Sequence, residues 1–171
     1  MFYNLVYKYG IDAFYERLKI VGVNAVLIAD LPPEEADDVM IASRKYGIEQ
    51  IFIISQATST PRLKKICEYV SGFVYIASVM GTTGVRDNVE TDTTELIKRI
   101  RENTDLPLCV GFGISKPEHV KKVLSAGSDG AIVGSALIKI IEENCENEDL
   151  MFKKISEYIS MMKEATKEIV K

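Results

Sequence analysis

The chain alternates short apolar runs with segments in which apolar residues recur every three or four positions. A continuous apolar run bounded by turn residues predicts a buried strand, and the longer spacing predicts an amphipathic helix. Strands are predicted in five places, at residues 24–29, 50–55, 72–78, 106–110 and 130–133. Each run leads into a segment of helical spacing, such as Leu63, Ile66 and Val70. About five strand-then-helix units therefore follow one another, and their uniformly apolar strands indicate an α/β fold with a parallel sheet covered by helices.

Proline, glycine and capping residues mark the ends of the predicted helices. A helix before the first strand is expected to end at Gly22, and the next is expected to begin at Pro32-Pro33 and to close at Gly47. The sequence Ser115-Lys116-Pro117-Glu118 has the spacing of a capping box at the start of a later helix. A final amphipathic helix is predicted from about Asn147.

Two successive strands near the C-terminal end run through glycine directly into a helix start. The first turn is Gly111-Phe112-Gly113-Ile114-Ser115, and the second is Gly134-Ser135-Ala136 at the end of the next strand. Free backbone N–H groups from two such turns can converge on one phosphate without any lysine. The alternative is that these glycines only permit tight turns. An open doubly wound sheet and part of a (β/α) barrel both fit the alternation, and the two turns favour the barrel.

Length and composition limit the classes of protein to which this chain can belong. The 171 residues show no linker or break in composition, so we expect a single domain, although a closed eight-unit barrel typically needs about 250 residues. A net charge of -4 argues against nucleic acid as a partner, and the absence of a long apolar run or a signal segment predicts a cytoplasmic protein without membrane contact. Three dispersed cysteines and one histidine, His119, predict neither a metal site nor disulfides, and His119 is expected to face solvent.

Several motifs occur in the order and spacing found in the alpha subunit of tryptophan synthase, and the chain is identified as a member of that family. The motifs are Asp30-Leu31-Pro32-Pro33-Glu34-Glu35, Gly72-Phe73-Val74-Tyr75, Gly81-Thr82-Thr83-Gly84, Gly111 to Pro117 and Gly134-Ser135-Ala136. The resemblance implies a (β/α)8 barrel that cleaves indole-3-glycerol phosphate to indole and glyceraldehyde 3-phosphate in tryptophan biosynthesis. Residues 1–171 would form one partial barrel of this type, with roughly the last five βα units.

The same resemblance implies that the first three βα units of the family are missing. Met1 to Tyr3 correspond to the end of the third barrel strand. The catalytic glutamate and aspartate of the family precede that point, so we expect a truncated alpha subunit, begun at an internal methionine and inactive alone. Glu49 is no substitute, because it enters its strand from the opposite end of the barrel. Asp30, at the carboxyl end of its strand, is the one carboxylate expected to face the site.

The resemblance also assigns site residues. Gly84, Gly113, Gly134 and Ser135 would bind the substrate phosphate. Tyr75 would be the active-site tyrosine at a strand end, and Thr83 would be the mobile-loop threonine that supports the catalytic aspartate. The residues implied to line the apolar indole pocket are Phe2, Leu27, Ala29, Ile53, Phe112 and Ile132.

The partner implied by the family is the beta subunit, with Asn4, Asp30 and Pro32 at the interface. Pyridoxal phosphate belongs to that subunit, so no cofactor or metal is expected in this chain. Two other functions are compatible with the residues. The first is a catalytically silent module, which binds either phosphate ligands or the beta subunit. The second is a different phosphate-binding barrel enzyme. The second of these does not explain the Gly81-Thr82-Thr83-Gly84 motif together with Asp30-Leu31-Pro32.

Overall fold

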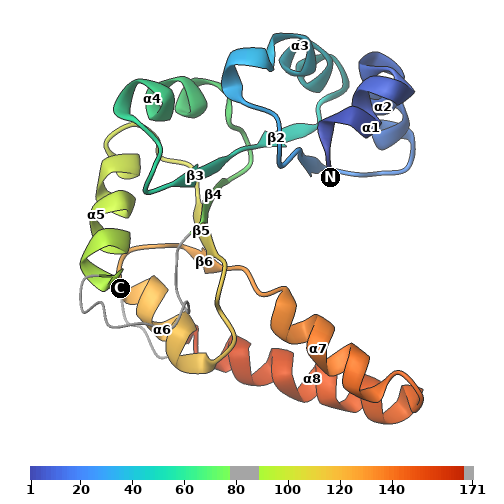
Figure 1. The fold of residues 1–171 in the computed structure, drawn as a ribbon, viewed down its shortest axis with the longest axis vertical. Helices are drawn as coiled ribbons and strands as arrows, with labels where there is room; N and C mark the ends of the chain where they lie inside the picture. Colours follow the sequence, from blue (N-terminus) through green and yellow to red (C-terminus); the bar gives the residue numbers. More distant parts are fainter. Residues whose placement is uncertain (78–88, 168–171) are drawn as a thin grey trace. The chain divides into compact units, whose positions relative to one another are not determined.

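The computed structural model describes residues 1–77 and 89–167 (Figure 1). The chain divides into two compact units. The first consists of Met1–Tyr75 with Ile100–Pro107, and the second of Ile76–Arg99 with Leu108–Lys171. Strand β4 (Val74–Ala77) begins in the first unit and ends in the second. The single-domain expectation stays a prediction, and the two units are described separately below.

The first unit opens with two helices and then alternates strand and helix. Its elements are α1 (Tyr3–Tyr9), α2 (Ile11–Ile20), β1 (Ala25–Leu27), η1 (Pro33–Glu35), α3 (Asp37–Tyr46), β2 (Glu49–Ile51), β3 (Ile53–Ser55) and α4 (Thr60–Tyr69). Strands β1 and β2 are parallel, with Val26 opposite Gln50. The carbonyl of Phe52, between β2 and β3, accepts the N–H of Tyr75 in β4 at 3.2 Å. The strand predicted at 50–55 is thus two short strands that pair with different neighbours.

The second unit continues the alternation. Its elements are α5 (Val89–Arg101), which ends in the first unit, β5 (Leu108–Gly111), α6 (Pro117–Ser125), β6 (Gly130–Ala131), α7 (Ser135–Asn144) and α8 (Glu148–Glu164). Strand β5 lies between β4 and β6, and the β5–β6 pair is parallel, with Val110 opposite Ala131. The predicted α/β class with parallel strands is therefore confirmed.

Two predicted helix starts are wrong because of proline. Pro32 has an extended backbone (φ -74°, ψ 149°), as expected for a residue that precedes a proline, so Pro33 begins only the 3₁₀ turn η1. The α-helix starts later, at Asp37, and ends at Gly47 in the left-handed conformation as predicted. Helix α6 begins at Pro117 with Lys116 as its N-cap, so the capping box between Ser115 and Glu118 does not form. Proline suits the first helical position because it has no N–H to satisfy.

The core of the first unit contains a polar pair that sequence patterns do not reveal. Tyr15 of α2 and Gln50 of β2 are both fully buried, and the tyrosine hydroxyl donates to the glutamine Oε1. The backbone of Gln50 also exchanges bonds with Ser71, whose hydroxyl accepts the Gln50 N–H at 3.0 Å. Burial raises the pKa of Tyr15 far above its ordinary value, so the phenol remains a donor. The pair therefore ties α2 to the β1–β2 sheet.

Replacing Tyr15 with phenylalanine is expected to lower the free energy of unfolding by about 1–3 kcal/mol, because the Gln50 oxygen then stays buried without its donor. Urea unfolding followed by circular dichroism measures this. Tyr9→Phe is the matched control, since the Tyr9 side chain is 59% exposed and its hydroxyl has no hydrogen bond within the described residues. Equal stability of the two variants would contradict the structural role of the Tyr15–Gln50 bond.

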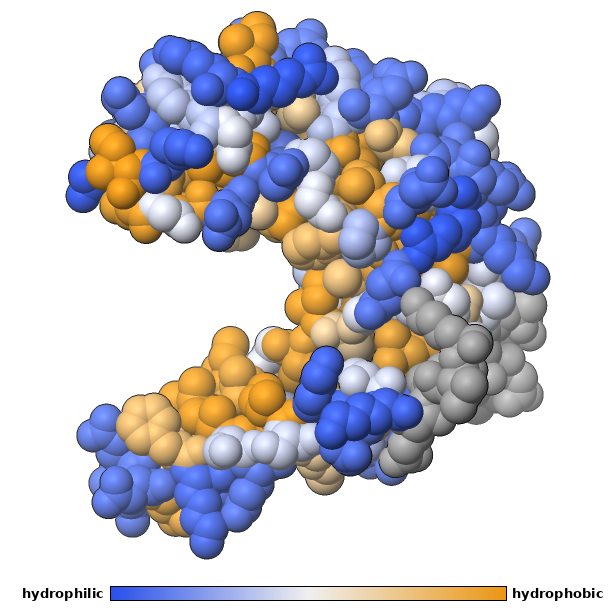
Figure 2. Space-filling model, turned by 180° about the vertical axis from the view of Figure 1, so that it is seen from behind, coloured by the Kyte–Doolittle hydropathy of each residue, from blue (hydrophilic) through white to orange (hydrophobic). Residues whose placement is uncertain are grey.

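Helices α7 and α8 of the second unit carry apolar side chains that no described element covers. Figure 2 shows apolar residues gathered over this helix pair. The exposed apolar residues of the pair are Ile138, Ile141, Leu150, Phe152, Ile159 and Met161. Strand β6, which leads into α7, is the last strand of its sheet. Exposed apolar side chains beside a terminal strand are typical of surfaces that contact another polypeptide. Within the described ranges, no helix is long and apolar enough to cross a membrane.

Candidate functional site

The two glycine turns leave adjacent parallel strands at the same edge of the sheet. Cys109 and Val110 of β5 lie opposite Gly130 and Ala131 of β6, and the Ile132 N–H donates to the Val110 carbonyl at 2.8 Å. Because parallel strands end at the same edge, both turns begin side by side there. The pairing expected of a phosphate cradle is thus present in the backbone.

The first turn has an uncommon backbone conformation. Phe112 (φ 70°) and Gly113 (φ 78°) are both left-handed, and Phe112 is the one non-glycine residue with positive φ in the described part of the chain. A bulky residue in this region is strained and is held there only when the surrounding structure enforces it. The Phe112 side chain is 58% exposed, so it does not fill the core.

The second turn presents donors at the start of α7. Gly134 is the N-cap, and its carbonyl accepts the N–H groups of Leu137 and Ile138 at 2.9 and 3.1 Å. The N–H groups of Ser135 and Ala136 make no hydrogen bond within the residues that the structure describes. Ser135 is exposed and adds a hydroxyl. A ten-residue helix with two unbonded N–H groups at its start favours a bound anion.

The loop that carries Thr83 and Gly84 lies outside the described residues. Their predicted roles, support of a catalytic aspartate and binding of phosphate, stay predictions. Tyr75 is described, on β4, with a half-buried side chain. Burial raises the pKa of Tyr75, so its hydroxyl is protonated and can donate a hydrogen bond at neutral pH.

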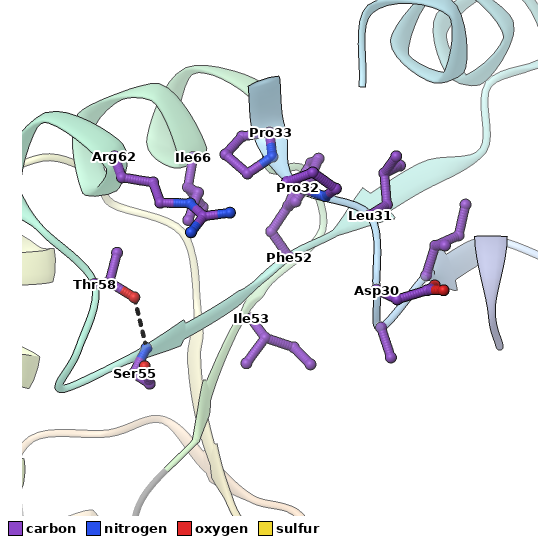
Figure 3. Close-up of a pocket in the computed structure, with 12 residues that line it drawn as sticks. Asp30, Leu31, Pro32, Pro33, Phe52, Ile53, Ser55, Thr58, Arg62 and Ile66 are labelled. Carbon is purple, nitrogen blue, oxygen red and sulfur yellow. Dashed lines mark hydrogen bonds between the residues drawn. The ribbon is translucent and has the colours of Figure 1, made fainter. Parts of the chain in front are cut away.

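A cavity of about 390 Å³ opens in the first unit beside the carboxyl ends of β1 and β3 (Figure 3). Ala29 and Ile53 from the predicted indole pocket line it, together with Asp30 and Pro32 from the predicted interface. The remaining lining residues are Ile28, Leu31, Pro33, Phe52, Ser55, Thr58, Arg62 and Ile66. The cavity therefore combines an apolar wall with a polar rim.

Arg62 is the charged residue of this rim that sequence reasoning missed. It extends from α4 toward η1 and forms an ion pair with Glu34 at 3.3 Å (Figure 3). Nearby, the Ser55 N–H donates to the Thr58 hydroxyl at 3.0 Å. Arg62 follows Pro61 in the first turn of a helix, and nothing in its local sequence distinguishes it from a solvated surface arginine.

Asp30 is engaged in a structural contact. Its Oδ1 accepts the N–H of Tyr3 at 2.6 Å, at the first residue of α1. A carboxylate at a helix N-terminus is favourable because it meets unsatisfied N–H groups and the positive end of the dipole. Asn4, in the same helix turn, is exposed. The Met1 amine donates to the Leu27 carbonyl at 2.7 Å, so the start of the chain lies along β1. Asp30 thus holds α1 against the end of that strand.

The predicted indole-pocket residues are divided between the two units. Phe2, Leu27, Ala29 and Ile53 belong to the first unit, and Phe112 and Ile132 to the second. Phe2 is 60% exposed, whereas Leu27, Ile53 and Ile132 are half-buried. The cavity unites only Ala29 and Ile53. Assignment of all six to one pocket stays a prediction.

The sequence predicted that His119 faces solvent, but the structure places it in a partly buried position. It is half-buried in the first turn of α6, and its Nδ1 accepts the N–H of Ser115 at 3.3 Å. The shift of the helix start to Pro117 brings His119 to the third helical position, from which a side chain reaches back to the residues before the helix. Within the described residues, no group of three histidine, cysteine or acidic side chains is arranged to hold a metal ion.

Comparison with known proteins shows the relationship of this chain to a family. The model of the tryptophan synthase alpha chain matches residues 1–167. A tryptophan synthase alpha chain from Methanothermobacter thermautotrophicus is 50% identical over 165 residues, which is 96% of this chain and 61% of that protein. The chain thus spans about three fifths of the length of this relative.

Solved structures agree with the sequence match. A chain in the tryptophan synthase a2b2 complex from Pyrococcus furiosus superposes with a TM-score of 0.83 at 34% identity, over 94% of this chain and 64% of that one. Tryptophan synthase subunit alpha from Legionella pneumophila superposes with a TM-score of 0.84 at 31% identity, over 98% of this chain and 61% of that one. With its family model, sequence relatives and fold in agreement, the chain belongs to the tryptophan synthase alpha chain family.

Proposed function

We propose that this chain supplies the phosphate-binding part of a site that cleaves indole-3-glycerol phosphate to indole and glyceraldehyde 3-phosphate. The observation that carries the proposal is the register of β5 and β6, which brings the two glycine turns to one sheet edge. Gly113 in the first turn and Gly134 and Ser135 in the second would bind the phosphate through backbone N–H groups and the serine hydroxyl. Gly84 would contribute from the preceding loop.

The apolar end of the substrate would lie against the residues that the family resemblance assigns to indole. Within the first unit, Ala29 and Ile53 line a partly apolar cavity, and apolar side chains suit a flat ring. Tyr75 would donate its hydroxyl toward the reacting glycerol, a role supported by the raised pKa of its phenol. These residues bind and orient the substrate and do not break its bond.

The bond-breaking step needs two proton transfers. A general acid protonates the indole ring carbon, a general base removes the proton of the adjacent glycerol hydroxyl, and the carbon–carbon bond then breaks to give indole and an aldehyde. By the family resemblance, none of this chain's residues corresponds to the catalytic glutamate or aspartate. Asp30 accepts the Tyr3 N–H through Oδ1 and so has a structural contact in this unit. We propose that cleavage depends on carboxylates from a part of the barrel outside these residues.

A beta subunit is the proposed partner, with Asn4, Asp30 and Pro32 at the contact surface. The similarity to a chain of the Pyrococcus a2b2 complex supports this proposal. Pyridoxal phosphate would belong to the beta subunit. A catalytically silent module, which binds phosphate or a beta subunit, is the second candidate, and the register of β5 and β6 supports it because this function needs only the phosphate turns.

Phosphate binding by the chain tests the proposal. Calorimetric titration with glycerol 3-phosphate and with inorganic phosphate is expected to give saturable binding, whereas glycerol gives none, because the backbone donors recognise the anion. Affinity should fall at high salt, as for any charge-dependent contact near the surface. Absence of phosphate binding at millimolar concentration would contradict the proposed site.

A further inference from the structure

The backbone of Ser115 is held on both sides by side chains from two different helices. Its N–H donates to Nδ1 of His119 on α6 at 3.3 Å, and its carbonyl accepts the hydroxyl of Tyr158 on α8 at 3.1 Å. Ser115, His119 and Tyr158 all belong to the second unit. His119 and Tyr158 are not among the residues of the proposed phosphate site. Both contact the turn only through the backbone of Ser115, at its C-terminal end.

These contacts matter because Ser115 is the far end of the first glycine turn. At the near end, β5 is fixed by pairing with β6 up to the bond between Ile132 and Val110. Between the two ends, Phe112 and Gly113 adopt left-handed conformations, and Ile114 is buried. A strained backbone persists only where its surroundings hold it. Fixing both peptide groups of Ser115 therefore sets the direction of the N–H groups in the turn.

We propose that His119 and Tyr158 are positioning residues that hold the Gly111–Ser115 turn in its phosphate-binding shape. The inference rests on the proposed phosphate site and goes beyond it, because neither side chain touches the ligand. Their contribution is preorganisation: a turn already fixed before binding loses less conformational freedom when the anion arrives.

The chemistry of the two side chains fits this role. Nδ1 of His119 is placed to accept the Ser115 N–H. Burial raises the pKa of Tyr158, which keeps its hydroxyl protonated as a donor. Tyr158→Phe removes that donor alone. An asparagine at 119 places an oxygen near the position of Nδ1, whereas leucine offers no acceptor.

The test compares phosphate affinity in the whole chain, with inorganic phosphate as the probe in calorimetric titration. His119→Leu and Tyr158→Phe are each expected to weaken binding roughly two- to tenfold, the equivalent of one ordinary hydrogen bond. His119→Asn is expected to restore most of the affinity, a rescue that simple packing would not produce. Tyr69→Phe is the matched control, because it also removes a tyrosine hydrogen bond, to Asp37, but in the other unit.

The outcomes separate this inference from the proposed function. If the unaltered chain does not bind phosphate, the proposed site is wrong and the inference falls with it. If the unaltered chain binds and both His119→Leu and Tyr158→Phe bind equally well, the inference alone is overturned. Should His119→Leu fail to fold, Tyr158→Phe decides the question, since it deletes a single oxygen atom from a half-buried residue.

Discussion

The 171-residue chain alone is expected to release no detectable indole from indole-3-glycerol phosphate. General acid–base catalysis typically contributes about 10²- to 10⁴-fold to a rate. By the family resemblance, none of the chain's residues corresponds to the catalytic glutamate or aspartate. Its best-placed carboxylate, Asp30, already accepts the Tyr3 N–H at 2.6 Å. Indole release is followed spectrophotometrically with the purified chain. Turnover near that of a complete alpha subunit would contradict the proposed division of the site.

Addition of a second polypeptide provides the complementary experiment. When the first three βα units of a family member are supplied as a separate chain, indole release is expected to appear. The control is the same polypeptide with its catalytic glutamate changed to glutamine, which can dock but cannot transfer the proton. Restoration by the unaltered polypeptide supports the proposed lyase function. Phosphate binding without any restoration supports the silent module instead.

Gly134→Asp is expected to weaken phosphate binding at least about tenfold without lowering the melting temperature. The added carboxylate would lie beside the unbonded N–H groups of Ser135 and Ala136, where it repels the anion and competes for its donors. Folding should tolerate the change, because φ of Gly134 is -130° and a Cβ there meets no atom within 4 Å. Aspartate is also a favourable N-cap residue. Calorimetric titration and thermal melts measure both effects.

Two further variants distinguish anion binding from turn geometry. Gly134→Asn has the same size and capping ability as the aspartate variant but no charge, so its loss of affinity should be smaller. Gly22→Ala forces a side chain into a left-handed position (φ 77°) in the other unit, so it should lower stability and leave phosphate affinity unchanged. If Gly134→Asp reduced stability but not phosphate affinity, the glycine would serve the turn alone.

Local patterns predicted the helices and strands well where one face is buried. Leu96, Ile97 and Ile100, spaced as a helix, are all buried in α5. The final helix begins after Asn147, whose side chain accepts the Leu150 N–H at 3.0 Å, as its capping preference suggests. Such features depend on residues within one or two helical turns of each other. For this reason the chain's own order of residues is enough to predict them.

Features that depend on pairing between distant residues were missed. The apolar run from Gln50 to Ser55 reads as one strand, yet it changes partners at Phe52 because β1 and β4 lie on different sides. The Tyr15–Gln50 bond joins residues 35 positions apart, and neither residue carries a local signal for it. The bond between Ser115 and His119 was missed for a local reason, because the N-cap of α6 is Lys116, one residue later than the predicted Ser115.

The candidate site also combines features that local sequence predicts with features that only the tertiary structure reveals. Glycine, serine and the family motifs were sufficient to predict two turns with free donors, because these depend on short stretches such as Gly134-Ser135. The register of β5 on β6 brings the two turns to one sheet edge. The packing of α8 near α6 allows the Tyr158 hydroxyl to donate to the Ser115 carbonyl. Fold class and family are thus predictable from the residues alone. The Asp30–Tyr3 and Ser115–Tyr158 bonds join residues 27 and 43 positions apart, and no local pattern encodes such contacts.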